Sequence, residues 1–407
     1  MMKNIKLLAF LLLFSSVFGV SAQSIMGSAN DFPKTIVLEG SVLQRNYQLI
    51  IENNPEKKAA LQSLLGKADK ILKEATLYSV MHKKQVPTSG DKHDYMSTGP
   101  YWWPDPTKPD GLPYIRKDGL RNPEYFEITD SQEMDKVEDD AEIMALAYYF
   151  TKEEKYANWA SKIIKTWFLN SETKQNPNLN FGQAIPGLNT GRGIGLIETR
   201  GLYRVIDAAI LIQGSNNWSK DDHLALKKWF SDFLTWLTES PIGKDEADEH
   251  NNHGTHYSVQ AISYGIFTDR PDIAVAEIET FKNRLESQLK PDGSQPFELV
   301  RTKSWNYANM NLDGYFIAAR LAENSQIDLW NYQTKEGKNI KSAVEWLIPY
   351  IKKEKKWEYE QIQNIGFGET VRILKIASKK YSNPDYDALA KKIDLKTYQL
   401  DSNQLTF

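Results

Sequence analysis

Cysteine is absent from the 407 residues of the chain. This absence excludes disulfide bonds and thiolate metal ligands, and it leaves no residue to which a cysteine-linked lipid anchor could attach. A chain of this length can bury a large apolar core. We therefore expect packing, rather than covalent cross-links, to stabilise the fold.

An excess of positive charge is also missing. The chain carries 50 Lys and Arg against 53 Asp and Glu, which gives a formal net charge of −3. Nucleic-acid binding depends on neutralising phosphates, so a mildly acidic chain is a poor candidate for it. An acidic polymer would need a local cluster of basic side chains.

Long apolar runs are scarce. The one prominent run, residues 7–18, follows Lys3 and Lys6 and precedes the small residues Val20-Ser21-Ala22. This order is typical of a signal peptide, and the run is too short to span a bilayer. We predict that residues 1–22 are a signal peptide, and that the mature protein is periplasmic or secreted without membrane insertion.

Strand-like alternation is equally scarce, and residues 35–39 are the best short candidate. From residue 55 onward, apolar residues recur at helical spacing. This periodicity predicts helices over 55–75, 137–151, 156–169, 196–213, 220–239, 257–267, 273–289, 307–323, 340–352 and 370–381.

Paired helices with short polar turns favour an all-α fold of antiparallel hairpins, an (α/α) toroid, over a four-helix bundle. No fixed-period repeat and no Gly/Ser-rich linker interrupts the chain, so we predict one domain over 23–407. Two long segments, 84–130 and 170–195, break the helical pattern, and loops of this length in a compact domain are often functional.

The chain does contain one dense group of proton-transfer side chains. Three of its six histidines lie in the run His250-Asn251-Asn252-His253-Gly254-Thr255-His256-Tyr257. If this run begins a helix, Asn252 and His256 lie one turn apart, and an amide beside an imidazole can bind a carboxylate. Steps of three residues carry the histidines around the helix, so we expect no metal site. A polar helix start without chemical function is the plainer alternative.

A second polar group occupies residues 298–307, Glu-Leu-Val-Arg-Thr-Lys-Ser-Trp-Asn-Tyr. Arg301 can hold a carboxylate through paired donors, and Tyr307 can donate or accept a proton. Taken singly, a surface ion pair and core packing are more ordinary interpretations of these two residues. Their combination with the histidine-rich run favours a functional site.

Aromatic and basic residues are interleaved in the two long segments. Tyr101-Trp102-Trp103 is followed by several Lys and Arg, a composition that suits acidic sugars, although a purely structural loop is the alternative. In the second long segment, Gln183, Arg192 and Arg200 lie in and around a glycine-rich run at 191–195. Its spacing Gly191-x-Gly193-x-Gly195 resembles a dinucleotide-binding loop but lacks the preceding strand and βαβ unit.

Five motifs together resemble the alginate lyase superfamily: Tyr-Trp-Trp-Pro-Asp-Pro at 101–106, Gln-Ala-Ile-Pro-Gly at 183–187, Gly-Arg-Gly-Ile-Gly at 191–195, Asn-Asn-His at 251–253 and Arg301 to Tyr307. The resemblance, which spans residues 60–370, is to polysaccharide lyases of families 38 and 5. Such enzymes are periplasmic or secreted (α/α) toroids. The Arg-to-Tyr gap is one residue shorter here than in well-known alginate lyases, which indicates a sister group such as family 38.

The resemblance implies catalysis of β-elimination by Asn252, His253, Arg301 and Tyr307. In this reaction a base removes the C5 proton of a uronate, and the C4–O bond breaks as its oxygen is protonated. We expect Asn252 and Arg301 to neutralise the substrate carboxylate. We expect Tyr307 to protonate the leaving oxygen, and either His253 or Tyr307, if Arg301 lowers its pKa, to act as the base.

No cofactor or metal is needed for this chemistry. Substrate contacts are expected from Tyr101, Trp102, Trp103, Gln183, Arg192, Arg200, His256 and Trp305.

The expected function is cleavage of a uronate polysaccharide, above all alginate, by a monomeric enzyme. A glucuronan lyase with the same site is one alternative. Another is a glycoside hydrolase that draws its two carboxylates from Glu138-Asp139-Asp140 or from 245–249. A non-catalytic glycan-binding protein is a third, because the aromatic residues alone would suffice for binding.

Overall fold

Helices dominate the computed structural model, which describes residues 32–393 and 402–406. The predicted signal peptide, 1–22, lies outside the described residues. The α-helices are α1 (Gly40–Ile51), α2 (Pro55–Glu74), α3 (Asp130–Thr151), α4 (Glu154–Phe168), α5 (Tyr203–Leu211), α6 (Lys220–Glu239), α7 (Pro241–Ala247), α8 (Asn252–Phe267), α9 (Pro271–Gln288), α10 (Pro296–Leu299), α11 (Ser304–Glu323), α12 (Ile340–Ile351), α13 (Gly368–Lys380) and α14 (Pro384–Ile393).

The remaining elements are short. Four 3-10 turns are η1 (Val80–His82), η2 (Pro123–Glu127), η3 (Gly193–Thr199) and η4 (Ser402–Leu405) among the described residues. The strands there are β1 (Met96–Thr98), β2 (Trp102–Trp103), β3 (Ile115–Arg116) and β4 (Phe181–Ala184).

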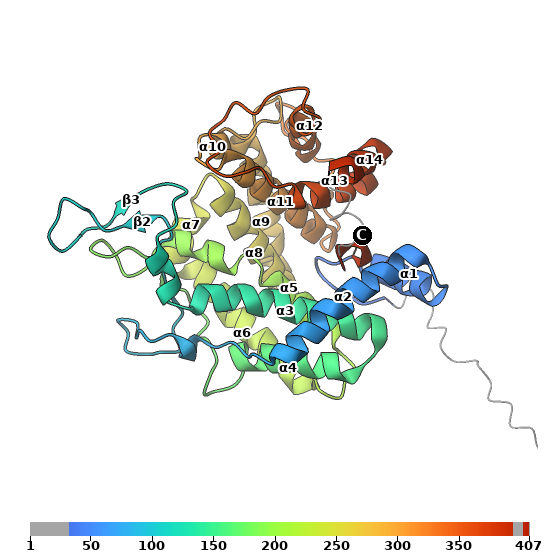
Figure 1. Cartoon of the computed structure of the whole chain (residues 1–407), viewed down its shortest axis with the longest axis horizontal. Helices are drawn as coiled ribbons and strands as arrows, with labels where there is room; N and C mark the ends of the chain where they lie inside the picture. Colours follow the sequence, from blue (N-terminus) through green and yellow to red (C-terminus); the bar gives the residue numbers. More distant parts are fainter. Residues whose placement is uncertain (1–31, 394–401, 407) are drawn as a thin grey trace, which may run out of the picture. The chain divides into compact units, whose positions relative to one another are not determined.

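The helices pack as neighbouring pairs around an apolar core. Figure 1 shows α3 beside α2 and α4, and α8 beside α9; α8 also contacts α6 and α11. Nearly every residue of α8 is buried, which is expected of a helix enclosed by others on all sides. Small side chains such as Ala318 and Ala319 let α11 approach its neighbours closely. No helix within the described ranges is both long and apolar enough to cross a membrane.

The predicted helices are present, but several begin earlier than the apolar periodicity indicated. The helix predicted from residue 137 begins at Asp130, and the one predicted from 257 begins at Asn252. The helix predicted over 196–213 is instead η3 followed by α5, because the chain turns at 200–202. The apolar periodicity did not predict α1, α7, α10 or α14.

The predicted strand at residues 35–39 is wrong. The backbone N–H groups of Ile36, Val37 and Leu38 donate to the Asp207 carboxylate at 2.6, 3.1 and 2.7 Å. A bent segment around a buried carboxylate satisfies these donors without a partner strand. Burial raises the pKa of Asp207 to about 7, against the effect of these three hydrogen bonds.

The two long loops are ordered against each other. β1 from the first loop pairs in parallel with β4 from the second, and β2 pairs with β3 in an antiparallel ribbon. The first loop thereby brings Tyr101 and Asp118 toward α10 and α11, while the second brings η3 against α7. This placement assembles the candidate site.

Candidate active site

The N-terminus of α8 contributes the first group of site residues. Asn251 caps the helix, and its side chain accepts the backbone N–H of His253 at 2.8 Å. The Gln288 amide holds the Asn251 carbonyl at 2.9 Å. Asn252 and His253 are therefore the first two helical residues, where the helix presents a partial positive charge.

Asn252 is buried and bound to a carboxylate that the sequence reading did not single out. Its backbone N–H and side-chain Nδ2 donate to the two oxygens of Glu298, at 2.7 and 2.8 Å. Burial raises the pKa of Glu298 to about 7, and the two hydrogen bonds from Asn252 oppose that rise. One Nδ2 hydrogen of Asn252 is thus already used within the protein, and the side chain has no exposed surface.

His253 is oriented by a second buried carboxylate. Its Nδ1 lies 2.8 Å from Oε1 of Glu246, whose side chain is 0% exposed while that of His253 is 13% exposed. Burial raises the pKa of Glu246, and the neighbouring His253 works in the opposite direction. With Nδ1–H donating to Glu246, Nε2 is the ring nitrogen that can accept a proton.

A glycine fixes the position of this carboxylate. A Cβ at Gly193 would lie 2.6 Å from the backbone nitrogen of Glu246, and the Gly193 N–H donates to Asp245 at 3.1 Å. Only glycine lets η3 pack this closely on α7. The glycine-rich motif of the second loop therefore serves the fold of the site and not a phosphate.

Arg301 lies in the short segment between α10 and α11. Its Nε and Nη2 donate to the two oxygens of Asp118 in the first loop, at 3.2 and 2.8 Å. Burial alone would raise the pKa of Asp118, but the hydrogen bonds and charge of Arg301 hold it well below its usual range. Arg116 also contacts Asp118 at 2.8 Å, so one carboxylate joins two cations.

Tyr307 lies one turn into α11 and beneath this guanidinium. The Arg301 guanidinium carbon is 3.9 Å from the Tyr307 ring centroid. The Tyr307 hydroxyl donates to the Tyr101 hydroxyl at 3.0 Å. Burial raises the pKa of Tyr307 above its usual range, and the lowering effect of Arg301 is smaller. Arg301 thus acts in the direction considered from the sequence, but burial outweighs it, so the Tyr307 pKa is raised and the phenol is protonated at neutral pH.

Electrostatic contacts connect the start of α8 with Arg301. The charges of Arg301 and His253 both act to lower the pKa of Glu298. The Glu298 backbone carbonyl also accepts the backbone N–H of Arg301 at 3.2 Å. Asn252, His253, Arg301 and Tyr307 thus lie in one region, as the sequence predicted, around the unpredicted Glu298.

The aromatic loop and the Arg192 motif border the same region. Arg192 donates to the backbone and side-chain oxygens of Gln183, both at 3.0 Å, and its guanidinium lies 5.7 Å from the Trp102 ring. The charge of Glu246 acts on Arg192, which places Arg192 on the His253 side. Trp103 is half-buried and donates to the Leu120 carbonyl at 2.9 Å.

Three further residues were predicted to contact the substrate: Trp305, Arg200 and His256. Trp305 is 2% exposed, with its indole donating to the Gly366 carbonyl, so its ring has no face open to a sugar beside Tyr307. Arg200 and His256 line a pocket of about 300 Å³, and the charge of His253 acts on His256. Burial lowers the pKa of His256 to about 3.

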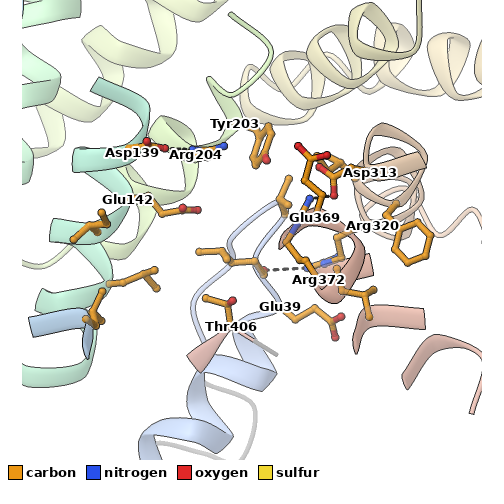
Figure 2. Close-up of a pocket in the computed structure, with 18 of the residues that line it drawn as sticks. Glu39, Asp139, Glu142, Tyr203, Arg204, Asp313, Arg320, Glu369, Arg372 and Thr406 are labelled. Atoms are coloured by element: carbon orange, nitrogen blue, oxygen red, sulfur yellow. Dashed lines mark hydrogen bonds and ion pairs between the residues drawn. The ribbon is translucent and has the colours of Figure 1, made fainter. Parts of the chain in front are cut away.

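A neighbouring pocket of about 430 Å³ is lined by charged side chains, including Asp139, Arg204, Asp313 and Arg372 (Figure 2). Asp139 pairs with Arg204, and Asp313 pairs with Arg372. Two of the carboxylates considered for a glycoside hydrolase are therefore engaged in ion pairs: Asp139 with Arg204, and Glu246 with His253.

Asp118, Glu246 and Glu298 are the site residues that sequence reasoning missed. Glu298 is the first residue of the polar group at 298–307, but no role was predicted for it. Glu246 belongs to the acidic run at 245–249, which is more often a solvent-exposed face. No sequence signal pointed to Asp118, which is 183 residues from Arg301.

Comparisons with known proteins identify the family of the chain. The family model described as "Alginate lyase" matches residues 79–357. An alginate lyase from Bacteroides ovatus is 37% identical with a TM-score of 0.87, over 92% of this chain and 99% of that chain. Alginate lyase A1-III from Sphingomonas species A1 is 15% identical with a TM-score of 0.54, over 87% and 92%. No curated protein sequence matches the chain.

A histidine-to-alanine variant of A1-III, solved with a tetrasaccharide, is 14% identical with a TM-score of 0.56, over 88% of this chain and 92% of that chain. At this identity the likeness concerns the fold alone, which is the predicted (α/α) toroid. The family match covers more than half of the chain, and it favours a lyase over the hydrolase and the glycan-binding protein considered from the sequence. The chain belongs to the alginate lyase family and is a polysaccharide lyase.

Proposed function

We propose that the protein cleaves alginate by β-elimination at the site formed by His253, Arg301 and Tyr307. The observation that carries the proposal is that a proton acceptor, a cation and a proton donor lie in one region of the fold. His253 is held by a buried carboxylate with Nε2 available, and Tyr307 is a protonated phenol beneath Arg301.

The cation and the helix terminus supply the electrostatic part of the mechanism. Asp118 occupies Nε and one Nη2 hydrogen of Arg301, which leaves the Nη1 donors for a substrate carboxylate. The N-terminus of α8 adds its partial positive charge. Asn252 contributes indirectly, because its side chain holds the Glu298 carboxylate through a hydrogen bond. Neutralising the carboxylate stabilises the enolate-like intermediate that forms when C5 loses its proton.

Proton transfer then follows from the two side chains. Nε2 of His253 takes the C5 proton, the C4–C5 double bond forms as the C4–O bond breaks, and the Tyr307 hydroxyl protonates the leaving oxygen. The proton gained by His253 replaces the one lost by Tyr307 through solvent after product release. The raised pKa of Tyr307 favours its role as the acid over a role as the base.

The similarity to the Bacteroides ovatus alginate lyase supports alginate as the substrate, and glucuronan is the alternative for the same chemistry. The test is a panel of mannuronate blocks, guluronate blocks and glucuronan, followed by the ultraviolet absorbance of the unsaturated product. We expect cleavage of alginate and at least a hundredfold loss in His253→Ala, since a general base contributes about 10²–10⁴. Wild-type rates in that variant would show that another residue is the base. Cleavage of glucuronan alone would show that glucuronan, and not alginate, is the substrate. A periplasmic or secreted location remains part of the proposal.

A further inference from the structure

Another pocket, of about 450 Å³, opens beside the C-terminal end of α12. Its volume falls within the range of about 300–1,000 Å³ that is usual for ligand sites. Figure 1 shows the segment after α12 running back toward α10 and the start of α11 before it reaches α13. The pocket lining consists of aromatic, basic and aliphatic side chains: Trp305, Tyr350, Lys353, Lys355, Lys356, Trp357, Ile365 and Phe367.

The aromatic side chains of this pocket form a rigid cluster. Trp357 lies edge-to-face against Trp305 and Tyr350, with ring centroids 5.0 and 5.1 Å apart. Trp305 is buried behind it and also contacts Phe367 at 5.6 Å. Trp357 and Tyr350 remain partly exposed, so they offer apolar faces of the kind on which a sugar ring stacks.

The basic side chains are available for an anion. Lys353, Lys355 and Lys356 are exposed, and none of the three forms an ion pair within the part of the chain that the structure describes. No carboxylate lines the pocket, although Glu354 and Glu358 lie in the same segment. Three cations around aromatic faces match a chain of acidic sugars better than a neutral glycan or a cation.

The pocket is joined to the candidate active site. The Trp357 indole donates to the Ser304 hydroxyl at 2.9 Å, and Ser304 begins α11 one turn before Tyr307. Gln361 forms a backbone bridge with Lys303, whose ammonium lies 5.5 Å from the Tyr101 ring centroid. A polymer that leaves the site over Lys303 would meet the pocket next.

We propose that this pocket is a second binding site for the acidic polysaccharide, which holds sugar units outside the cleavage site. The inference rests on the proposed function for the identity of the polymer. Such a site strengthens the binding of long chains by raising the effective concentration of the polymer at the cleavage site. Chains too short to span both sites gain nothing from it.

The test compares a triple variant, Lys353→Gln, Lys355→Gln and Lys356→Gln, with a control that loses the same charge at exposed lysines of α2 and α6. The control carries Lys70→Gln, Lys73→Gln and Lys220→Gln. Two quantities are measured for each protein at low and high salt: the Kd for polymeric alginate in a Tyr307→Phe background, and the KM for the polymer and for a tetrasaccharide in the active background.

We expect the triple variant to raise the Kd and KM for the polymer roughly tenfold at low salt, with kcat and the tetrasaccharide kinetics unchanged. Each exposed charge contributes modestly, and salt screens the effect. Polymer affinity equal to that of the control would overturn the proposal, as would a lowered Tm alone, because the lysines would then serve only the end of α12. Loss of polymer binding without any uronate cleavage in the active background would retain this site and refute the proposed function.

Discussion

At the scale of single residues, two buried carboxylates decide what the site can do. Glu246 fixes the tautomer and direction of His253, and Glu298 fixes Asn252 against α10. Each carboxylate is desolvated and held by neighbours that favour its charged form. A proton taken by His253 therefore creates a cation beside a fixed negative charge, which stabilises it.

Removing that charge tests the pairing of Glu246 with His253. Glu246→Gln keeps the shape and one hydrogen bond but loses the charge, so we expect kcat to fall by about 100-fold or more, with a smaller change in KM. Steady-state kinetics on alginate provide the measurement. The control is Asp248→Asn, an exposed carboxylate close by, which should behave as wild type. Equal kinetics in the two variants would remove Glu246 from the mechanism.

The sequence identified the residues that carry recognisable chemistry and missed those that orient them. Asn252, His253, Arg301 and Tyr307 stand in short motifs, so their chemical types are visible along the chain. Their partners lie 7 residues away for Glu246, 46 for Glu298 and 183 for Asp118. From the sequence alone, an acidic residue on a helix is expected to be exposed to solvent, and only the packing shows that it is buried. The same limit explains Trp305, whose aromatic type suited sugar binding but whose ring is in the core.

At the scale of elements, the first long loop acts through one ion pair. Asp118 follows β3 and holds Arg301 by two hydrogen bonds, so the loop sets the direction of the guanidinium. Without this partner, Arg301 would keep its charge and lose its orientation.

We therefore expect Asp118→Asn to lower kcat/KM by roughly tenfold to a hundredfold, because a misaligned cation stabilises the intermediate less well. Asp110→Asn, in the same loop but bound only to its local backbone, should leave kcat/KM unchanged. Kinetics on alginate with both variants check the claim. An active Asp118→Asn enzyme would show that the loop does not orient Arg301.

Two glycines make a contrasting pair. A Cβ at Gly193 would meet the backbone of α7, whereas a Cβ at Gly66 in α2 has no heavy atom within 4 Å. Gly193→Ala should destabilise the protein by about 1–3 kcal/mol and reduce activity, because α7 and Glu246 must shift. Gly66→Ala should stabilise it by about 0.5–1 kcal/mol without affecting activity. Chemical denaturation measures both, and a neutral Gly193→Ala would contradict the close packing of η3 on α7.

Helices with clear apolar periodicity were predictable, and elements defined by long-range contacts were not. The helix over Lys220–Glu239 has the predicted bounds because Ser219 and Asp222 form a capping box visible in the sequence. The apolar periodicity placed the start of α8 at residue 257, because the cap Asn251 precedes polar residues rather than an apolar face. The segment at 35–39 bends because Asp207, far along the chain, binds its backbone.

At the scale of the whole molecule, buried carboxylates link stability to pH. Burial raises the pKa of Glu138 to about 8 and those of Glu198, Asp207 and Glu298 to about 7. A folded-state pKa above the unfolded value means that the folded protein binds more protons between the two values, so stability falls as pH rises through that window. His256, with its pKa lowered to about 3 from 6.5, acts oppositely but only below pH 6.5.

We therefore expect Tm to decrease steadily between about pH 6.5 and 8, where the carboxylates act alone. Thermal unfolding at constant ionic strength across this range provides the measurement. Glu138→Gln should flatten the decrease, since a neutral side chain does not need to ionise in the core. Glu172→Gln, at an exposed position, should not alter the slope. A Tm that rises toward pH 8 would contradict the assigned charge states.

The most direct test of the account is the rate at which Tyr307→Phe forms unsaturated product from alginate, measured together with its affinity for the same polymer. The account predicts that the absorbance of the new double bond falls by about 10³-fold or more, because the leaving oxygen has lost its proton donor, while Kd stays within about twofold. Turnover near the wild-type rate in this variant would contradict the assigned site.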